Sequence, residues 1–161
     1  IGNGATEGMK LALNIAAMLI AFISIIALLN WALGLISFGN TILSIELILG
    51  YLFMPLAFLM GAPWSEAHVL GSLMGQKLVL TEFIAYGNLA SLGDSVSTKT
   101  ATIAAYALCG FANFASIGIQ LGGIGSIAPE RKKDLAKLVM KAMIGGALAS
   151  WLTATIAGIL L

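Results

Sequence analysis

The stretch GQKLVLTEFIAY, residues 75–86, places one carboxylate between two apolar runs. That carboxylate, Glu82, is the only acidic residue between Glu66 and Asp94. An ionised side chain at membrane depth costs at least about 2.5 kcal/mol, so it usually faces a polar cavity, a substrate or an ion. A surface glutamate on an interfacial loop is the plainer alternative. The remainder of the chain favours the first interpretation.

The composition is that of a membrane protein. The chain has 161 residues, of which 60% are hydrophobic and 9% charged, whereas about a quarter of a soluble domain is charged. The net charge of +1 gives no indication of a nucleic-acid partner. The single Cys109 excludes an internal disulfide and a multi-cysteine metal site, and we expect it to be a small packing residue in a helix. His68 has no second ligand nearby, so we expect it to pack or to cap.

Two segments are long and apolar enough to cross a bilayer, which takes about 20 residues. The first lies within 1–37 and the last is 130–161. Between them, residues 41–60 are apolar but carry Glu46 and are cut by Pro55, after a turn signal at Gly39-Asn40. Aromatic residues cluster around this segment, which predicts a helix in the membrane interface.

Residues 64–90 consist of two apolar pieces that are each too short to cross a hydrocarbon core of about 30 Å. The polar pair Thr81-Glu82 lies at their junction, which predicts a re-entrant helical hairpin with its tip there. Ser65 is the expected N-cap of the first arm. The polar residues 88–100 after the hairpin predict a loop outside the membrane.

Residues 100–128 form a second interrupted segment. Gly110 precedes Asn113 and Ser116, which would share one face of a helix, and further glycines follow. Glycine on both sides favours a helix that unwinds or a close approach of backbones. A helix-packing face of small residues, Gly118-x-x-x-Gly122, is the alternative.

The distribution of basic residues predicts the orientation. Lys10 precedes the first span, five basic residues lie at the start of the last one, and the positive-inside rule puts both ends in the cytoplasm. Transporters built from a hairpin, a broken helix and spans usually contain these parts twice, in inverted copies, so we interpret this chain as one copy. We expect an all-α integral membrane protein, and we expect the chain, which begins with Ile1 and has no signal-peptide character, to be the C-terminal part of a longer one.

At this point the motifs resemble a known family. Residues 75–86 resemble the signature G-x-K-x-x-x-N-E-F-V-A-Y of concentrative nucleoside transporters. CGFANFASIG, residues 109–118, resembles that family's C-G-F-A-N-F-x-S-I-G segment, and the match continues through GGIG (122–125) and APER (128–131). The resemblance covers essentially the whole chain.

The resemblance implies a cation-coupled nucleoside symporter of the plasma membrane, the inner membrane in a bacterium, that works as a homotrimer by alternating access. Residues 1–37 would belong to the scaffold and 38–161 to the moving transport domain. Glu82 would accept hydrogen bonds from ribose hydroxyls, Asn113 and Ser116 would complete the sugar site, and Phe111 would pack beside a uridine-like nucleoside. No organic cofactor is implied.

The resemblance also implies which parts of the site are absent. The groups that hold the coupling cation, sodium or a proton, and those that select the base would come chiefly from the N-terminal half of the protein, so no metal ligand is expected here. Thr81 replaces the family's Asn at the hairpin tip beside Phe83, and Ile84 replaces Val. Thr81 lacks the side-chain amide through which that Asn would contact the substrate or the opposing hairpin.

Two other functional classes are open from the residues alone. A channel or structural subunit would use the small-residue faces for packing. A membrane-embedded enzyme would use Glu82 as acid or base, but the sequence shows no second acid, suitable histidine or nucleophile at a clear spacing. Cation-driven saturable uptake separates a symporter from both classes.

Overall fold

The computed structural model describes residues 2–35, 37–38 and 41–161. Its regular structure is helical, apart from an antiparallel pair of two-residue strands, β1 (Ser37–Phe38) and β2 (Thr41–Ile42). The helices in chain order are α1 (Gly2–Gly34), α2 (Ile45–Leu59), α3 (Trp64–Val79), α4 (Glu82–Leu92), η1 (Gly93–Ser95), α5 (Thr98–Leu108), α6 (Phe114–Ile127), η2 (Pro129–Arg131) and α7 (Lys132–Leu160). The expectation of an all-helical chain is therefore confirmed in its coarse form.

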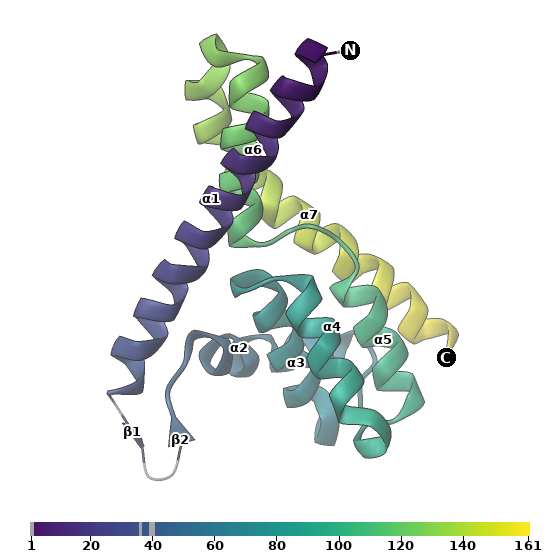
Figure 1. The fold of residues 1–161 in the computed structure, drawn as a ribbon. Coiled ribbons are helices and arrows are strands. Elements are labelled where there is room, and N and C mark those ends of the chain that lie inside the picture. The colour runs from purple at the N-terminus through teal and green to yellow at the C-terminus, as the bar shows by residue number, and fades with distance from the viewer. Residues whose placement is uncertain (1, 36, 39–40) are drawn as a thin grey trace.

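The long first and last helices diverge around a cluster of shorter ones (Figure 1). α1 runs past α6, and α7 runs from the far end of α6 to the opposite side of the cluster formed by α2 to α5. By length and composition, two segments of the described chain could cross a membrane, Gly4–Gly34 and Pro129–Leu160. These are the two segments for which the sequence predicts spans.

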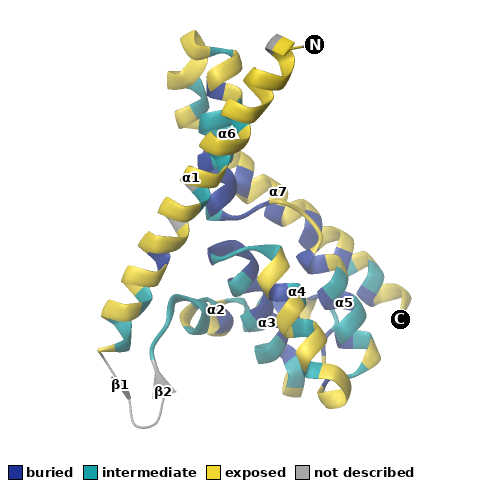
Figure 2. Ribbon diagram, viewed as in Figure 1, coloured by how far each residue is buried: buried dark blue, intermediate teal, exposed yellow. Residues whose placement is uncertain are grey.

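The core lies where α3 packs against its neighbours, whereas α1 is exposed along most of its length (Figure 2). α3 lies against α2 at backbone distance, because a Cβ atom on Gly71 would stand 2.5 Å from the carbonyl oxygen of Gly50. Side chains from α2 to α7, together with Met60 at the end of α2, form one apolar cluster, which includes Leu70, Met74, Ile103, Leu108 and Trp151.

Both interrupted segments of the sequence are interrupted helices in the structure. α3 ends at Val79 and α4 begins at Glu82, with two residues between them. α5 ends at Leu108 and α6 begins at Phe114. The glycines beyond Asn113 do not unwind the chain, because α6 continues through them to Ile127.

Several local expectations are wrong. α2 continues through Pro55 rather than being cut there, since its packing against α3 offsets the hydrogen bond that proline removes. The N-cap of α3 is Pro63, with Ser65 inside the helix. Cys109 is exposed at the C-cap of α5 instead of packed in a helix. The predicted turn at Gly39-Asn40 lies outside the described residues.

The predicted loop 88–100 is shorter than expected because its polar residues satisfy backbone groups locally. The Ser91 hydroxyl donates to the Gly87 carbonyl within α4, which runs on to Leu92. The Ser97 hydroxyl accepts from the Thr100 amide and caps α5. Ser97 also donates through its amide and its hydroxyl to the Glu66 carboxylate, at 3.1 and 2.7 Å, which fastens α5 to the start of α3.

Candidate functional site

The first part of the site is the junction between α3 and α4. Thr81 is the N-cap of α4, and its hydroxyl accepts a hydrogen bond from the Ile84 amide. Glu82 follows as the first residue of that helix. A carboxylate is stabilised there, because the unpaired amides of a helix N-terminus carry partial positive charge. The sequence places this charge at the hairpin tip by local helix chemistry alone.

The second part is the break between α5 and α6. Gly110 has a φ of +132°, a conformation that glycine adopts without strain. Asn113 then caps α6. Its side-chain oxygen accepts a hydrogen bond from the Ser116 backbone amide over 2.7 Å, and its backbone amide donates to the Ser116 hydroxyl. This reciprocal pair is a capping box. Asn113 and Ser116 are thus brought together by a cap rather than by a shared helical face.

The two breaks meet in space although they lie 31 residues apart in the chain. The Asn113 side-chain amide donates to the Glu82 carboxylate oxygen Oε2 over 2.9 Å. The N-termini of α4 and α6 therefore converge on one carboxylate. Among the described residues, the other oxygen, Oε1, has no protein hydrogen-bond partner. A donor on a small ligand can bind to it.

A cavity of about 460 Å³ opens at this junction. Five of the residues that the sequence singles out line it: Glu82, Asn113, Phe111, Thr81 and Phe83. The Phe111 and Phe83 rings are largely exposed, so both can cover a bound molecule. The volume falls within the range of roughly 300–1,000 Å³ typical of small-molecule sites.

Ser116 does not line this cavity. Its side chain is buried, and its hydroxyl donates to the Asn113 carbonyl and accepts from the Asn113 amide. In this arrangement Ser116 supports Asn113, which itself is only 1% exposed.

One wall of the cavity was not foreseen from the sequence. It consists of Ile15, Leu19 and Ile23, three residues that recur at helical spacing on α1. The polar residues Lys10, Asn14 and Ser24 lie on the opposite side of α1, so the sequence marks this face as apolar but does not say what it covers. Only the packing of α1 beside α6 assigns it to the site.

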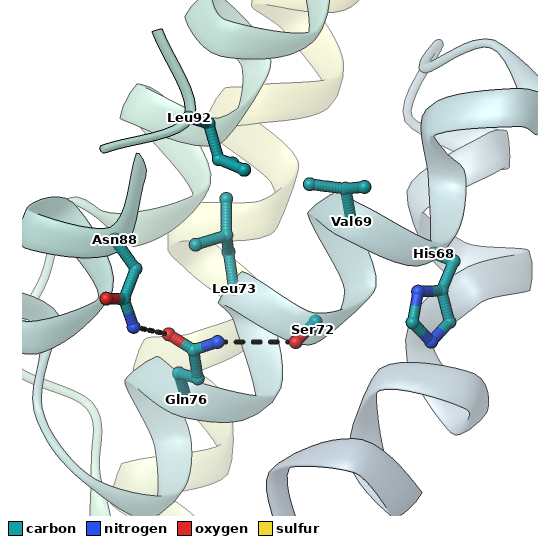
Figure 3. Close-up of a pocket in the computed structure, with 7 residues that line it drawn as sticks. All are labelled: His68, Val69, Ser72, Leu73, Gln76, Asn88 and Leu92. Carbon is teal, nitrogen blue, oxygen red and sulfur yellow. Dashed lines mark hydrogen bonds between the residues drawn. The ribbon is translucent and has the colours of Figure 1, made fainter. Parts of the chain in front are cut away.

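A second cavity, of about 250 Å³, lies between the two arms of the hairpin (Figure 3). Three of its polar side chains bind one another: Asn88 donates to Gln76, and Gln76 donates to Ser72. The His68 Nε2, which is also buried, has no hydrogen-bond partner among the described residues. The His68 ring stacks at a tilt on Tyr51, with 4.5 Å between ring centroids, as expected for a packing histidine. We place the site at Glu82, where a charged acceptor remains open. No cluster of His, Cys, Asp or Glu suited to a metal ion occurs within residues 2–35, 37–38 and 41–161.

The family described as "Na+ dependent nucleoside transporter C-terminus" matches residues 1–158. The chain is 52% identical over 97% of its length to the uncharacterized transporter YutK of Bacillus subtilis, and 44% identical over 99% of its length to the nucleoside permease NupC of Helicobacter pylori. It covers 39% and 40% of those two proteins, and so spans about two fifths of their length.

Solved structures give the same result. A structure of a CNTnw variant in an intermediate state is 43% identical, with a TM-score of 0.88 over 99% of this chain and 41% of the other. A structure of CNTnw in an inward-facing substrate-bound state is 42% identical, with a TM-score of 0.75 over 98% of this chain and 38% of the other. The fold is therefore shared, and the similarity depends on the state of the neighbour.

Proposed function

The chain belongs to the family of Na⁺-dependent nucleoside transporters, and we propose that it forms the ribose-binding half of a cation-coupled nucleoside symporter. The family consists of transporters and not of enzymes, which removes the enzymatic alternative for Glu82. The single observation that carries the proposal is the Glu82–Asn113 hydrogen bond between two residues that line the cavity, with the second carboxylate oxygen open.

The chemistry of this pair suits a sugar. A carboxylate accepts from hydroxyl groups, and such charge-assisted bonds are about twice as strong as neutral ones. The Asn113 amide holds one carboxylate oxygen and thereby orients the other toward the ligand. Phe111 and Phe83 supply apolar surface for the remainder of a uridine-like nucleoside. The site rejects a sugar without hydroxyls, because a buried acceptor would then stay unpaired.

We place the protein in the plasma membrane, crossing it at Gly4–Gly34 and Pro129–Leu160, with the hairpin α3–α4 entering without crossing. The start of α1 and the turn between α6 and α7 lie at the same end of the molecule (Figure 1). Lys10 and the basic residues 131–133 lie at this end, which the positive-inside rule assigns to the cytoplasm.

Transport would proceed by alternating access, with residues 38–161 moving past a scaffold that contains 1–37. The drop in TM-score from 0.88 to 0.75 at nearly constant identity supports a rearrangement of large parts between states. The proposal includes an N-terminal half that supplies the base-reading groups and most ligands of the coupling ion, sodium or a proton, and a homotrimeric assembly.

The test is uptake of labelled uridine by the full-length protein in proteoliposomes, with and without an inward sodium gradient. We expect Glu82→Gln to lower uridine uptake roughly 10- to 100-fold, the value of one or two charge-assisted hydrogen bonds. Uptake of 2′,3′-dideoxyuridine, which lacks the hydroxyls, should already be weak in the wild-type protein and should change far less on this substitution. Glu130→Gln removes an equivalent charge from an exposed position and is the matched control.

Wild-type uridine uptake by Glu82→Gln at equal protein content would disprove the assignment of the site. Uptake without sodium dependence would support a nucleoside transporter that is coupled to protons instead of sodium. Nucleoside-independent ion current without uptake would favour a channel instead.

A further inference from the structure

Lys77 carries a charge in the most buried part of the molecule. It lies in the last turn of α3, is 0% exposed, and is the largest of the fully buried side chains among the described residues. An ammonium group loses several kcal/mol of hydration on burial unless it is hydrogen-bonded. The hydrogen bonds of the buried ammonium group must therefore offset the hydration that it loses.

Those contacts lie at the break of the broken helix. The Lys77 Nζ donates to the Ala107 carbonyl over 2.9 Å and to the Ser150 hydroxyl of α7 over 2.6 Å. Ala107 is in the last turn of α5, where the final four carbonyls have no amide partner within the helix and carry partial negative charge. The ammonium thus binds the negative end of α5.

The other arm of the hairpin, α4, also binds a carbonyl at the end of α5. The Tyr86 hydroxyl of α4 donates to the Ala105 carbonyl over 2.7 Å. The Cys109 amide donates to the Tyr106 carbonyl between them. Three consecutive carbonyls that the break would leave free are therefore satisfied, two of them by side chains of the hairpin. An unsatisfied carbonyl at membrane depth costs several kcal/mol, so these bonds favour the broken over the continuous helix.

Lys77 and Tyr86 flank the hairpin tip, within the same twelve-residue stretch that contains Glu82. Only four residues, 109–112, separate the capped end of α5 from Asn113, so the position of that end restricts where Asn113 can lie. The Lys77–Ser150 hydrogen bond joins α7 to the same point, and the Ser150 hydroxyl in turn donates to the Ala147 carbonyl within α7.

We propose that Lys77 and Tyr86 are positioning residues that cap the carbonyl end of α5, hold the break open and thereby place Asn113 against Glu82. The hairpin tip and the broken helix then move as one body, because each is fastened to the other at the tip and at the break. The effect on nucleoside binding rests on the proposed function, whereas the effect on the geometry of the break does not.

The test compares Lys77→Met and Tyr86→Phe in the full-length purified protein. Met74→Leu, one turn earlier on α3 and equally buried, controls for core packing, and Tyr106→Phe controls for loss of a tyrosine hydroxyl on an exposed ring. The first readout is the rate at which a maleimide alkylates Cys109, the exposed residue at the break, without nucleoside and located by mass spectrometry. The second is the Kd for uridine by calorimetry.

We expect Lys77→Met to change the alkylation rate and raise the uridine Kd, each roughly tenfold, and Tyr86→Phe to do so by about threefold, with both controls at wild-type values. Tyr86→Phe removes one oxygen atom and keeps the proposal testable if Lys77→Met fails to fold. Folded variants with wild-type alkylation rates and wild-type Kd would overturn the inference. If the wild-type protein bound no uridine, the proposed function would fail, and the alkylation rates would still decide whether the cap exists.

Discussion

The helices α1 and α3 reverse the relation between hydrophobicity and burial that is usual in a water-soluble protein. α1 contains the more hydrophobic sequence, yet most of its length is exposed. α3 contains His68, Gln76 and Lys77, yet more than half of its residues are buried. Burial in this molecule therefore does not follow hydropathy, as expected where the exterior faces lipid and polar groups turn inward.

Close backbone packing explains how α3 reaches its position. Gly71 and Gly75 face α2, and a Cβ atom on either would stand within 3 Å of atoms of that helix. On α1, by contrast, a Cβ atom on Gly4 or Gly8 would meet nothing within 4 Å. The same residue type thus has opposite roles in the two helices: close approach in α3 and no packing role in α1.

The largest expected effect follows from this contrast. Gly71→Ala should destabilise the protein by about 3 kcal/mol, because the added methyl group meets backbone atoms of α2 that cannot move independently. Gly8→Ala should be neutral or stabilising by up to about 1 kcal/mol, since alanine favours a helix. SDS-induced unfolding of the two variants measures the difference. Equal stabilities would show that α2 and α3 are not in backbone contact.

A charge on α1 tests what covers its exposed face. Ile20 lies near the middle of this helix with 67% of its surface exposed. Ile20→Lys should disfavour membrane insertion by about 2.5 kcal/mol if that face of α1 contacts lipid. If that face contacts water, the lysine should not affect insertion. Leu161→Lys, at the end of the chain, is the control, because its side chain can reach the interface. The measurement is the fraction inserted in a glycosylation-mapping assay, and unchanged insertion of Ile20→Lys would place the face in water.

The smallest effect concerns the polar link between α1 and α2, the helix that packs against α3. Asn30 of α1 donates to both oxygens of the Glu46 carboxylate over 2.9 Å and accepts from the Ile45 amide, which fastens α1 to the start of α2. Asn30→Ala should cost about 1.5 kcal/mol in unfolding free energy, because it leaves the carboxylate partly unpaired. Asn14→Ala, on an exposed face of α1, should cost nothing measurable. A loss of equal size in both variants would contradict the link.

Much of the candidate site could be predicted from local sequence. Thr81-Glu82 between two short apolar pieces indicated the hairpin tip, and the residues around Asn113 indicated a second break, because both patterns depend on neighbours in the chain. Ser65 and Pro55 show the limit of that reasoning. A cap at Ser65 and a helix break at Pro55 were predicted from residue type, but α3 begins one residue before Ser65 and α2 continues through Pro55 against α3.

The sequence by itself determined the helical class, the two long apolar segments and the identity of Glu82 as an isolated charge, since these follow from composition, periodicity and motif. Only the tertiary structure decided that Asn113 bonds Glu82, that α1 forms a wall of the cavity and that Lys77 binds the end of α5. Each of these contacts joins residues more than 20 positions apart. Such pairs are set by how helices pack, and helix packing depends on the shape of several segments at once rather than on the residues within any one of them.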